Sequence, residues 1–499
     1  MTRWREDFVE EGLMLKELTR RTLLRGGTAV AGVAVMDLSS TGRLLAQYTP
    51  SDLHARPLPV KRRFTSLAVE RTIAKTRAEI RDPQLATMFE NCFPNTLDTT
   101  VFPGTFDGKP DTFVITGDID AMWLRDSSAQ VTPYLPYAKQ DPALAKLIEG
   151  VIRRQARLVT LDPYANSFMR SEDAKPLSWS VHDRTDMKPS VGERKWEIDS
   201  LCYTVRLAHA YWKAVGDTAP FDERWHTAAR TIVKTFREQQ RKDNPGPYHF
   251  QRQEWNPTDT LTGSGFGAPA KSNGMIFSMF RPSDDACVYP LFVPANLFAV
   301  RSLRQLAEMA KAIAHDDALA EDATRLADEV AAAVAAHGIV ERPEFGKIFA
   351  YEVDGYGNAL CMDDANAPGL LSLALLECVE VDDPMYQRTR RFALSEANPY
   401  FYRGKIAEGI GGPHVGDGYI WPMSIIVRAL TSKDDTEIEQ CLRWLRNTTA
   451  GTNFMHEAFW KDDAAKFTRP WFAWANTLFG ELILRVHAER PHLLTKSYM

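Results

Sequence analysis

The sequence lacks the features that mark several large classes of protein. Its 499 residues include only six cysteines, far apart and without a CxxC pair, so it predicts neither a disulfide framework nor a structural zinc site. Its 60 Lys and Arg against 65 Asp and Glu give a net charge of −5, without the basic excess of a nucleic-acid-binding protein. We therefore expect buried, reduced cysteines and no nucleic-acid partner.

Long apolar runs are also scarce at the N-terminus, where a leader is expected. Arg20 and Arg21 precede the small, weakly apolar run 26–38, which is shorter than the roughly 20 residues that span a bilayer. This pattern predicts a twin-arginine export leader over residues 1–46, cleaved near Ala46, and no membrane anchor. The protein would then be periplasmic or secreted. Because the acidic residues Glu6, Asp7, Glu10 and Glu11 precede the arginine pair, an amphipathic N-terminal helix is the alternative.

The rest of the chain predicts helices, with few strands. Apolar residues recur at spacings of three and four in about a dozen segments, which indicates amphipathic helices. One of these is expected near 368–380, and a hairpin strand is expected over 347–353, turned by Asp354 and Gly355. No linker divides residues 60–490, so we predict one all-α domain over 47–499, compatible with an (α/α)6 toroid.

Polar and aromatic residues gather between the predicted helices. The six clusters are 116–128, 195–200, 280–287, 362–368, 409–422 and 451–476. An Arg beside an Asp and near a Trp, as in Trp123, Arg125 and Asp126, can grip sugar hydroxyls and stack on a sugar face. Two adjacent carboxylates, Asp284 and Asp285, can be held in different protonation states.

Structural interpretations of the same acids remain open from the sequence alone. Asp126 or Ser127, and likewise Ser283 or Asp284, could cap a helix. Glu197 could be a first-turn acid that the helix dipole favours, and 362–368 could be a cap before a helix starting near Pro368. A loop calcium site at Asp118 and Asp120 is a further alternative, although no His-x-x-x-His or EF-hand spacing occurs.

Several long segments resemble glycoside hydrolase family 125, in family order over roughly residues 60–490. They are GDIDAMWLRDSSAQ (117–130), KWEIDSLCY (195–203), MFRPSDDA (279–286), MDDANAPGLLSL (362–373), GIGGPH (409–414), YIWPMSII (419–426), and AGTNFMHEAFWKDD with FTRPWFAWANTLFGEL (450–482). The resemblance implies an (α/α)6 barrel, exo-acting release of α-1,6-linked mannose with inversion, and no metal or other cofactor. The implied partner is an α-mannoside; the oligomeric state is left open.

The resemblance also assigns roles to individual residues. The general acid falls at Asp284, with Asp285 as the alternative, and the general base falls at Glu457. The implied mannose-binding residues are Trp123, Arg125, Asp126, Asp364, His414, Trp421 and His456. Ala458 stands where the family pattern has Ser, which would alter hydrogen bonding near the base. A glucoamylase-like α-glycosidase and a non-catalytic glycan-binding protein are the alternative functions.

Overall fold

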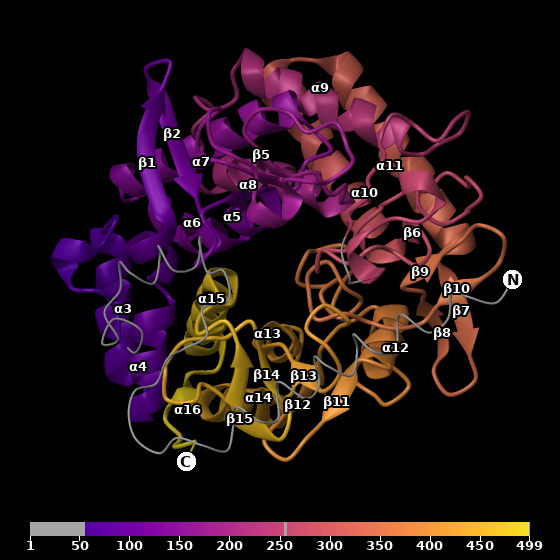
Figure 1. Cartoon of the computed structure of the whole chain (residues 1–499). Coiled ribbons are helices and arrows are strands. Elements are labelled where there is room, and N and C mark those ends of the chain that lie inside the picture. Colours follow the sequence, from indigo (N-terminus) through magenta and orange to yellow (C-terminus); the bar gives the residue numbers. More distant parts are fainter. Residues whose placement is uncertain (1–54, 254–256, 499) are drawn as a thin grey trace, which may run out of the picture. The chain divides into compact units, whose positions relative to one another are not determined.

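Helices supply most of the regular structure in the computed structural model, which describes residues 55–253 and 257–498 (Figure 1). The α-helices are α3 (Leu67–Glu79), α4 (Pro83–Cys92), α5 (Leu124–Val131), α6 (Leu135–Ala138), α7 (Pro142–Leu161), α8 (Ile198–Val215), α9 (Glu223–Glu238), α10 (Val293–Met309), α11 (Asp317–His337), α12 (Pro384–Ala393), α13 (Pro422–Leu430), α14 (Asp435–Asn447), α15 (Ala473–Glu489) and α16 (Pro491–Leu494). The prediction of a mostly helical fold is confirmed.

The longer helices divide into two groups by how they begin. An Asp side chain accepts hydrogen bonds from the first backbone N–H groups of α4, α7, α9, α11, α12 and α14. No side chain caps α5, α8, α10, α13 or α15, whose N-cap residues are Trp123, Glu197, Phe292, Trp421 and Phe472. The second group therefore leaves the positive ends of its dipoles open to other partners.

The uncapped helices pack on one another inside the fold. Helix α5 contacts α8 and α15, α8 contacts α10, and α15 contacts α13. The Asp-capped helices pack outside them, α7 on α8 and α9, α11 on α10, and α14 on α13. A single large cluster of buried apolar side chains joins both groups, with Trp196, Tyr134 and Phe93 among its fully buried members.

The strands form small antiparallel sheets. They are β1 (Val101–Phe106) with β2 (Lys109–Val114), β3 (Met122–Trp123) with β4 (Ser167–Phe168) and β5 (Val191–Glu193), β6 (Leu291–Phe292) with β9 (Glu352–Val353) and β10 (Ala359–Leu360), β7 (Ile339–Arg342) with β8 (Gly346–Phe349), β11 (Phe401–Arg403) with β12 (Glu408–Ile410), and β13 (Tyr419–Ile420) with β14 (Ala458–Trp460) and β15 (Asp463–Thr468). Strands β3, β6 and β13 each lead into an uncapped helix.

Two sequence predictions of local structure are corrected. Residues 368–380 form turns rather than a helix, because their hydrogen bonds mix spacings of three, four and five residues and Glu377 lies in the left-handed region. The single strand expected over 347–353 is split into β8 and β9, which pair with different partners. The Asp354–Gly355 turn does connect β9 to β10.

The predicted leader, residues 1–46, lies outside the described residues. Within the described ranges, none of the helices combines the length and the apolar character that crossing a membrane requires.

Candidate active site

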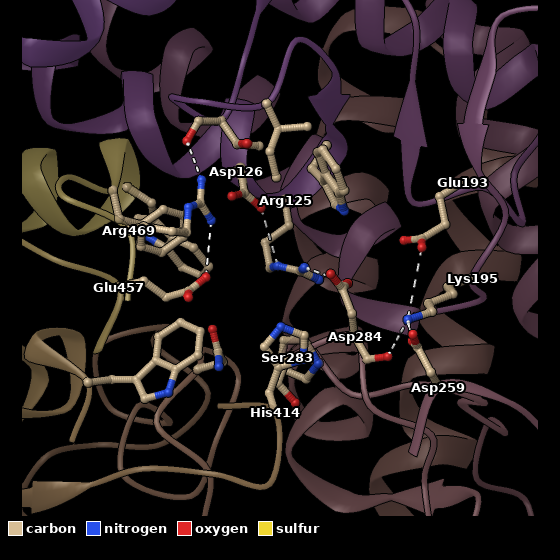
Figure 2. Close-up of a pocket in the computed structure, with 18 of the residues that line it drawn as sticks. Arg125, Asp126, Glu193, Lys195, Asp259, Ser283, Asp284, His414, Glu457 and Arg469 are labelled. Atoms are coloured by element: carbon tan, nitrogen blue, oxygen red, sulfur yellow. Dashed lines mark hydrogen bonds and ion pairs between the residues drawn. The ribbon is translucent and has the colours of Figure 1, made fainter. Parts of the chain in front are cut away.

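A cavity of about 370 Å³ lies where the uncapped helices α5, α8, α13 and α15 begin (Figure 2). Its lining residues are Thr116, Ile119, Trp123, Arg125, Asp126, Trp179, Glu193, Lys195, Arg252, Asp259, Pro282, Ser283, Asp284, Asn366, His414, Trp421, Glu457, Arg469, Phe472 and Trp474. All six sequence clusters contribute to this lining. Segments that are hundreds of residues apart in the chain therefore meet at one concave site.

Glu457 enters the cavity from the start of the central strand of a three-stranded sheet. It directly precedes β14, and the pairing of Ala458 with Thr468 brings it beside Arg469 at the end of β15. The Arg469 Nη1 donates to Glu457 Oε1 at 3.1 Å, and its Nε donates to Asp118 Oδ2 at 3.2 Å. Burial disfavours the charge on Arg469, but the two carboxylates outweigh it and raise its pKa. Glu457 is therefore held by a cation that also anchors the 117–130 segment.

Asp284 faces Glu457 from the other side of the cavity (Figure 2). It lies in a turn with a φ of 68°, in the left-handed region that a non-glycine residue rarely adopts. The buried Lys195 donates from Nζ to the Asp284 carbonyl at 2.7 Å, which fixes this backbone. Asn166 Nδ2 lies 3.4 Å from Asp284 Oδ1, and the Asp284 side chain is 25% exposed.

Asp285, the alternative acid, points away from the cavity. It is buried, it accepts a hydrogen bond from Ser283 Oγ at 3.1 Å, and its Oδ1 lies 3.8 Å from Nδ1 of His414. Burial acts to raise the pKa of Asp285, but the neighbouring His414 ring outweighs it and lowers this pKa. Asp284 therefore faces the cavity, while Asp285 holds His414 at its rim.

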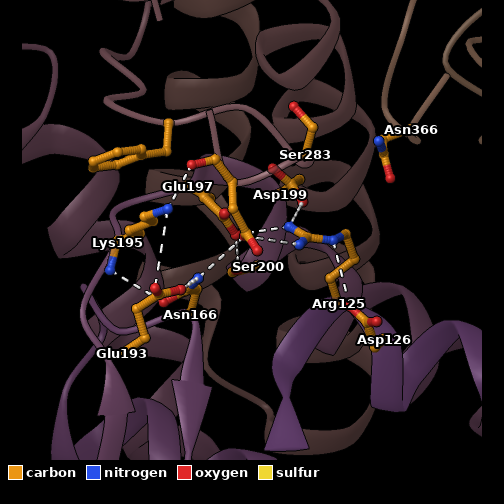
Figure 3. A network of polar contacts seen from close by, with 12 residues as sticks. Arg125, Asp126, Asn166, Glu193, Lys195, Glu197, Asp199, Ser200, Ser283 and Asn366 are labelled. Carbon is orange, nitrogen blue, oxygen red and sulfur yellow. Dashed lines mark hydrogen bonds and ion pairs between the residues drawn. The ribbon is translucent and has the colours of Figure 1, made fainter. Parts of the chain in front are cut away.

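Arg125, which lines the cavity, lies close to four carboxylates, three of which, Asp126, Glu197 and Asp199, are labelled in Figure 3. Its Nη1 lies 2.7 Å from Glu197 Oε2 and 3.1 Å from Asp199 Oδ2, its Nη2 lies 3.4 Å from Asp284, and its Nε lies 3.5 Å from Asp126. We call these five residues the Arg125 cluster. Burial raises the pKa of Asp126 to about 6, although Arg125 opposes this shift.

Aromatic side chains line the rest of the cavity. Trp123, Trp421, Phe472 and Trp474 come from the starts of uncapped helices, and they are almost fully buried. Trp179 is partly exposed and packs with Trp123 in a small apolar cluster separate from the main core. Its indole Nε1 donates to Glu193 Oε1 at 3.1 Å, which fixes the ring at the cavity.

Two residues predicted to bind sugar, Asp364 and His456, are not among the residues that line the cavity. Asp364 is buried and accepts hydrogen bonds from the backbone and side chain of Asn366, which does line the cavity. A Cβ at Gly412 would lie 2.9 Å from the Asp364 carboxylate, so this glycine allows the 409–414 loop to approach closely. Asp364 thus supports the cavity wall from behind.

His456 supports the neighbourhood of Glu457 in a similar way. Its ring stacks on Phe467 with centroids 3.9 Å apart, and its two nitrogens lie near the carbonyls of Thr449 and Arg469. Burial lowers the pKa of His456, which favours the neutral ring. The other predicted sugar-binding residues, Trp123, Arg125, Asp126, His414 and Trp421, all line the cavity.

The capping interpretations of the acids are wrong. The N-cap of α5 is Trp123, and neither Asp284 nor Asp364 precedes a helix. Glu197 is the N-cap of α8, but its side chain makes no capping bond and contacts Arg125 instead. Among the described residues no group of three or more His, Cys, Asp or Glu side chains could hold a metal, and Asp118 and Asp120 contact different arginines.

Several residues of the site are not predicted from the sequence. Arg469, Lys195 and Asn366 lie inside the six sequence clusters, but nothing in the sequence showed that they face Glu457, Asp284 and the cavity. Trp179 lies in the segment 169–194, outside every cluster, where no local pattern indicated a functional aromatic residue.

Comparisons with known proteins agree on one family. Residues 82–484 match the family model described as metal-independent alpha-mannosidase (GH125). The Schizosaccharomyces pombe (strain 972) meiotically up-regulated gene 157 protein is 45% identical over 459 residues, which cover 89% of this chain and 90% of that protein. A Streptococcus pneumoniae metal-independent alpha-mannosidase, solved in a non-productive complex with α-1,6-mannobiose, is 42% identical with a TM-score of 0.82, covering 86% of this chain and 100% of that chain.

Proposed function

The chain belongs to the metal-independent α-mannosidases of glycoside hydrolase family 125, and from this premise we propose that it releases α-1,6-linked mannose from non-reducing ends with inversion. The observation that carries the proposal is the placement of Asp284 and Glu457 on opposite sides of one cavity (Figure 2). An inverting glycosidase needs two carboxyl groups separated widely enough to admit the sugar carbon and a water molecule.

In the proposed reaction, the Asp284 carboxyl donates its proton to the glycosidic oxygen as the bond from that oxygen to the anomeric carbon breaks. Glu457 accepts a proton from a water molecule, whose oxygen forms the new bond to the anomeric carbon on the opposite face. The enzyme is left with an ionised Asp284 and a protonated Glu457, and proton exchange with solvent restores both. Arg469, which holds Glu457, orients its carboxylate toward the water.

The shape of the cavity supports action at a chain end. The cavity is small, about 370 Å³, and residues at the starts of the uncapped helices line it, the buried rings of Trp123, Trp421 and Trp474 among them. A terminal sugar can enter such a site, whereas an internal sugar of a longer chain would need a second opening. The Arg125 and Asp126 side chains supply the charged hydrogen-bonding groups that fix the sugar hydroxyls.

We propose an (α/α)6 barrel as the fold that holds this site. In Figure 1 the helices follow one another in sequence order around a common centre, and the uncapped helices make the inner contacts. The irregular turns at 369–378 occupy the interval between α10 and α13, where a sixth inner helix would be expected. The Tyr203 hydroxyl on α8 donates to the Ala367 carbonyl, which ties this interval to the inner helices.

We also propose that residues 1–46 are a twin-arginine leader, that residues 47–499 are the catalytic domain, and that the enzyme is periplasmic or secreted. The arginine pair and the short apolar run support this proposal. N-terminal sequencing of the mature protein should find a start near residue 47, and replacement of the arginine pair by lysines should abolish export. An intact Met1 on protein recovered outside the cytoplasm would contradict it.

The proposed reaction can be tested by NMR of the sugar first released from α-1,6-mannobiose. We expect β-mannose before mutarotation, because the water attacks the face opposite the leaving group. Maltose serves as the control substrate and should release no glucose. Glucose from maltose would indicate a glucoamylase-like enzyme, α-mannose would contradict inversion, and binding without turnover would indicate a glycan-binding protein.

Trp179 is expected to bind the sugar on the leaving side of the scissile bond. The partly exposed ring, held by Glu193, offers a flat face at the cavity. Trp179→Ala should raise KM for α-1,6-mannobiose about tenfold, corresponding to roughly 1.4 kcal/mol of lost stacking, and change KM for a simple aryl mannoside much less. Trp212→Ala on α8, outside the cavity, is the control. An equal rise in KM for both substrates would place Trp179 elsewhere.

A further inference from the structure

The Arg125 cluster contains more negative charge than its guanidinium can balance. Glu197, Asp199, Asp284 and Asp126 all lie within 3.5 Å of Arg125 nitrogens, and Glu197 and Asp199 are fully buried. Lys195 and Arg469 are the other nearby cations, but Lys195 also contacts Asp259 and lies 4.0 Å from Glu193, and Arg469 binds Asp118 and Glu457. Even with Asp284 protonated as the proposed acid, three buried carboxylates still face Arg125, and their short separations disfavour full ionisation, so the cluster keeps a further proton.

The hydrogen bonds indicate which residue carries this proton. Glu197 Oε2 accepts from Arg125 and from Ser200 Oγ at 2.9 Å, whereas Glu197 Oε1 is buried and has no partner among the described residues. An ionised oxygen in that position would be buried without a donor, which is costly. A proton on Oε1 removes the cost, because the Asp284 carboxyl lies beside Glu197 and can accept a hydrogen bond from it.

Asp199 Oδ1 is also buried without a hydrogen-bond partner among the described residues, but the surroundings of Asp199 favour its ionised form more strongly. It lies in the first turn of α8, where the positive end of the helix dipole and its own backbone N–H favour a negative charge, and it is the second carboxylate on Arg125 Nη1. Burial raises the pKa of both residues, and it raises that of Glu197 well above its usual value, with Asp284 adding to the shift.

From this geometry we infer that Glu197 is a protonated positioning residue whose Oε1–H donates a hydrogen bond to the Asp284 carboxyl. This inference rests on the proposed role of Asp284 as the general acid. When Asp284 transfers its proton to the glycosidic oxygen, it becomes a carboxylate. The Glu197 hydroxyl then makes a charge-assisted hydrogen bond to that carboxylate, so the contact strengthens in the transition state. Glu197 itself keeps its proton throughout.

The titratable groups that face this cluster set the expected pH dependence. They are Arg125 and Asp126 on α5, Asp199 and Tyr203 on α8, Asp284 in the loop 281–287, Lys195 before α8, His414, Arg469 after β15, and Tyr248, whose hydroxyl donates to the Arg194 carbonyl. Because a protonated Glu197 is neutral, its replacement by Gln would change no charge. Replacement of the ionised Asp199 by Asn would leave the Arg125 charge less balanced.

The test compares Glu197→Gln, Glu197→Leu and Asp199→Asn in the full-length enzyme. Glu197→Leu removes the donor and should lower kcat about 100-fold. Glu197→Gln offers an N–H in place of the O–H and should restore kcat to within about tenfold of the wild type. If Glu197 instead served as an ionised partner of Arg125, Glu197→Gln would be as slow as Glu197→Leu, and that result would overturn the inference.

The pH profile of kcat/KM supplies a readout that loss of packing would not move. Asp199→Asn should move the alkaline limb about one unit to lower pH, since Arg125 then favours the Asp284 carboxylate more strongly. Glu197→Gln should move this limb by less than half as much. Equal movement in both variants would show that Glu197 is ionised.

Infrared spectroscopy tests the proton without any turnover. At neutral pH, the difference between wild-type and Glu197→Gln spectra should contain the carbonyl band of a protonated carboxylic acid, and the band should persist in Asp199→Asn. Absence of this band would contradict the inference even if Glu197→Leu does not fold. If the wild-type protein hydrolyses no mannoside, the proposed function fails, while the infrared result still decides the state of Glu197.

Discussion

Glu457→Gln should lower kcat on α-1,6-mannobiose by about 10²–10⁴-fold, the usual contribution of a general base. The Gln side chain has almost the same size as Glu, but it cannot accept a proton from water. Arg469 would keep its contact with Asp118 and could still donate to the Gln carbonyl, so the cavity should keep its shape. Binding of the intact substrate, measured calorimetrically, should change less than tenfold, because the lost interaction acts in the transition state.

Glu437→Gln is the matched control for this variant. Glu437 on α14 also binds arginines, at 2.9 Å from Arg390 and 2.7 Å from Arg428, but it lies outside the cavity. The Glu437→Gln substitution should lower the melting temperature and leave kcat unchanged. Near-wild-type turnover by Glu457→Gln would contradict the assignment of the base, and a parallel loss of binding and melting temperature would indicate a structural role instead.

The sequence was sufficient to predict the helical class and the local segments that carry the site. The apolar periodicity over 222–239 and 318–337 predicted α9 and α11 almost to their ends, because each of these helices buries one continuous stripe. The 368–380 segment failed this test for a physical reason. It has the apolar residues of a helix, but Asp363 binds the backbone N–H groups of Leu370 and Leu371 and fixes an irregular course.

The placement of the site residues required tertiary structure. Asp284 and Asp285 are neighbours in the sequence, yet the left-handed backbone of Asp284 directs the two carboxyl groups to different surroundings. His456 and Glu457 are also adjacent, and the alternation of side chains around β14 places only Glu457 in the cavity. No local pattern could show that Arg125 would meet Glu197, Asp199 and Asp284 from two other segments.

Asp284→Asn and Asp285→Asn are expected to differ strongly, because their side chains occupy different environments. Asp284→Asn removes the group proposed to protonate the glycosidic oxygen and should lower kcat/KM on α-1,6-mannobiose about 10²–10⁴-fold. Asp285→Asn weakens the contact that holds His414, whose Nδ1 lies 3.8 Å away. It should lower kcat/KM about tenfold, which corresponds to a positioning contact of about 1.4 kcal/mol.

The leaving group then separates the loss of an acid from the loss of a binding contact. A mannoside with an acidic phenol departs as a phenolate without protonation, so it needs little help from a general acid. Asp284→Asn should therefore retain much more of its activity on that substrate than on mannobiose, while Asp285→Asn should lose a similar factor on both. If instead Asp285→Asn shows the larger loss, and this loss depends on the leaving group, Asp285 is the general acid. The cavity must then rearrange when substrate binds, so that the buried carboxyl of Asp285 reaches the glycosidic oxygen.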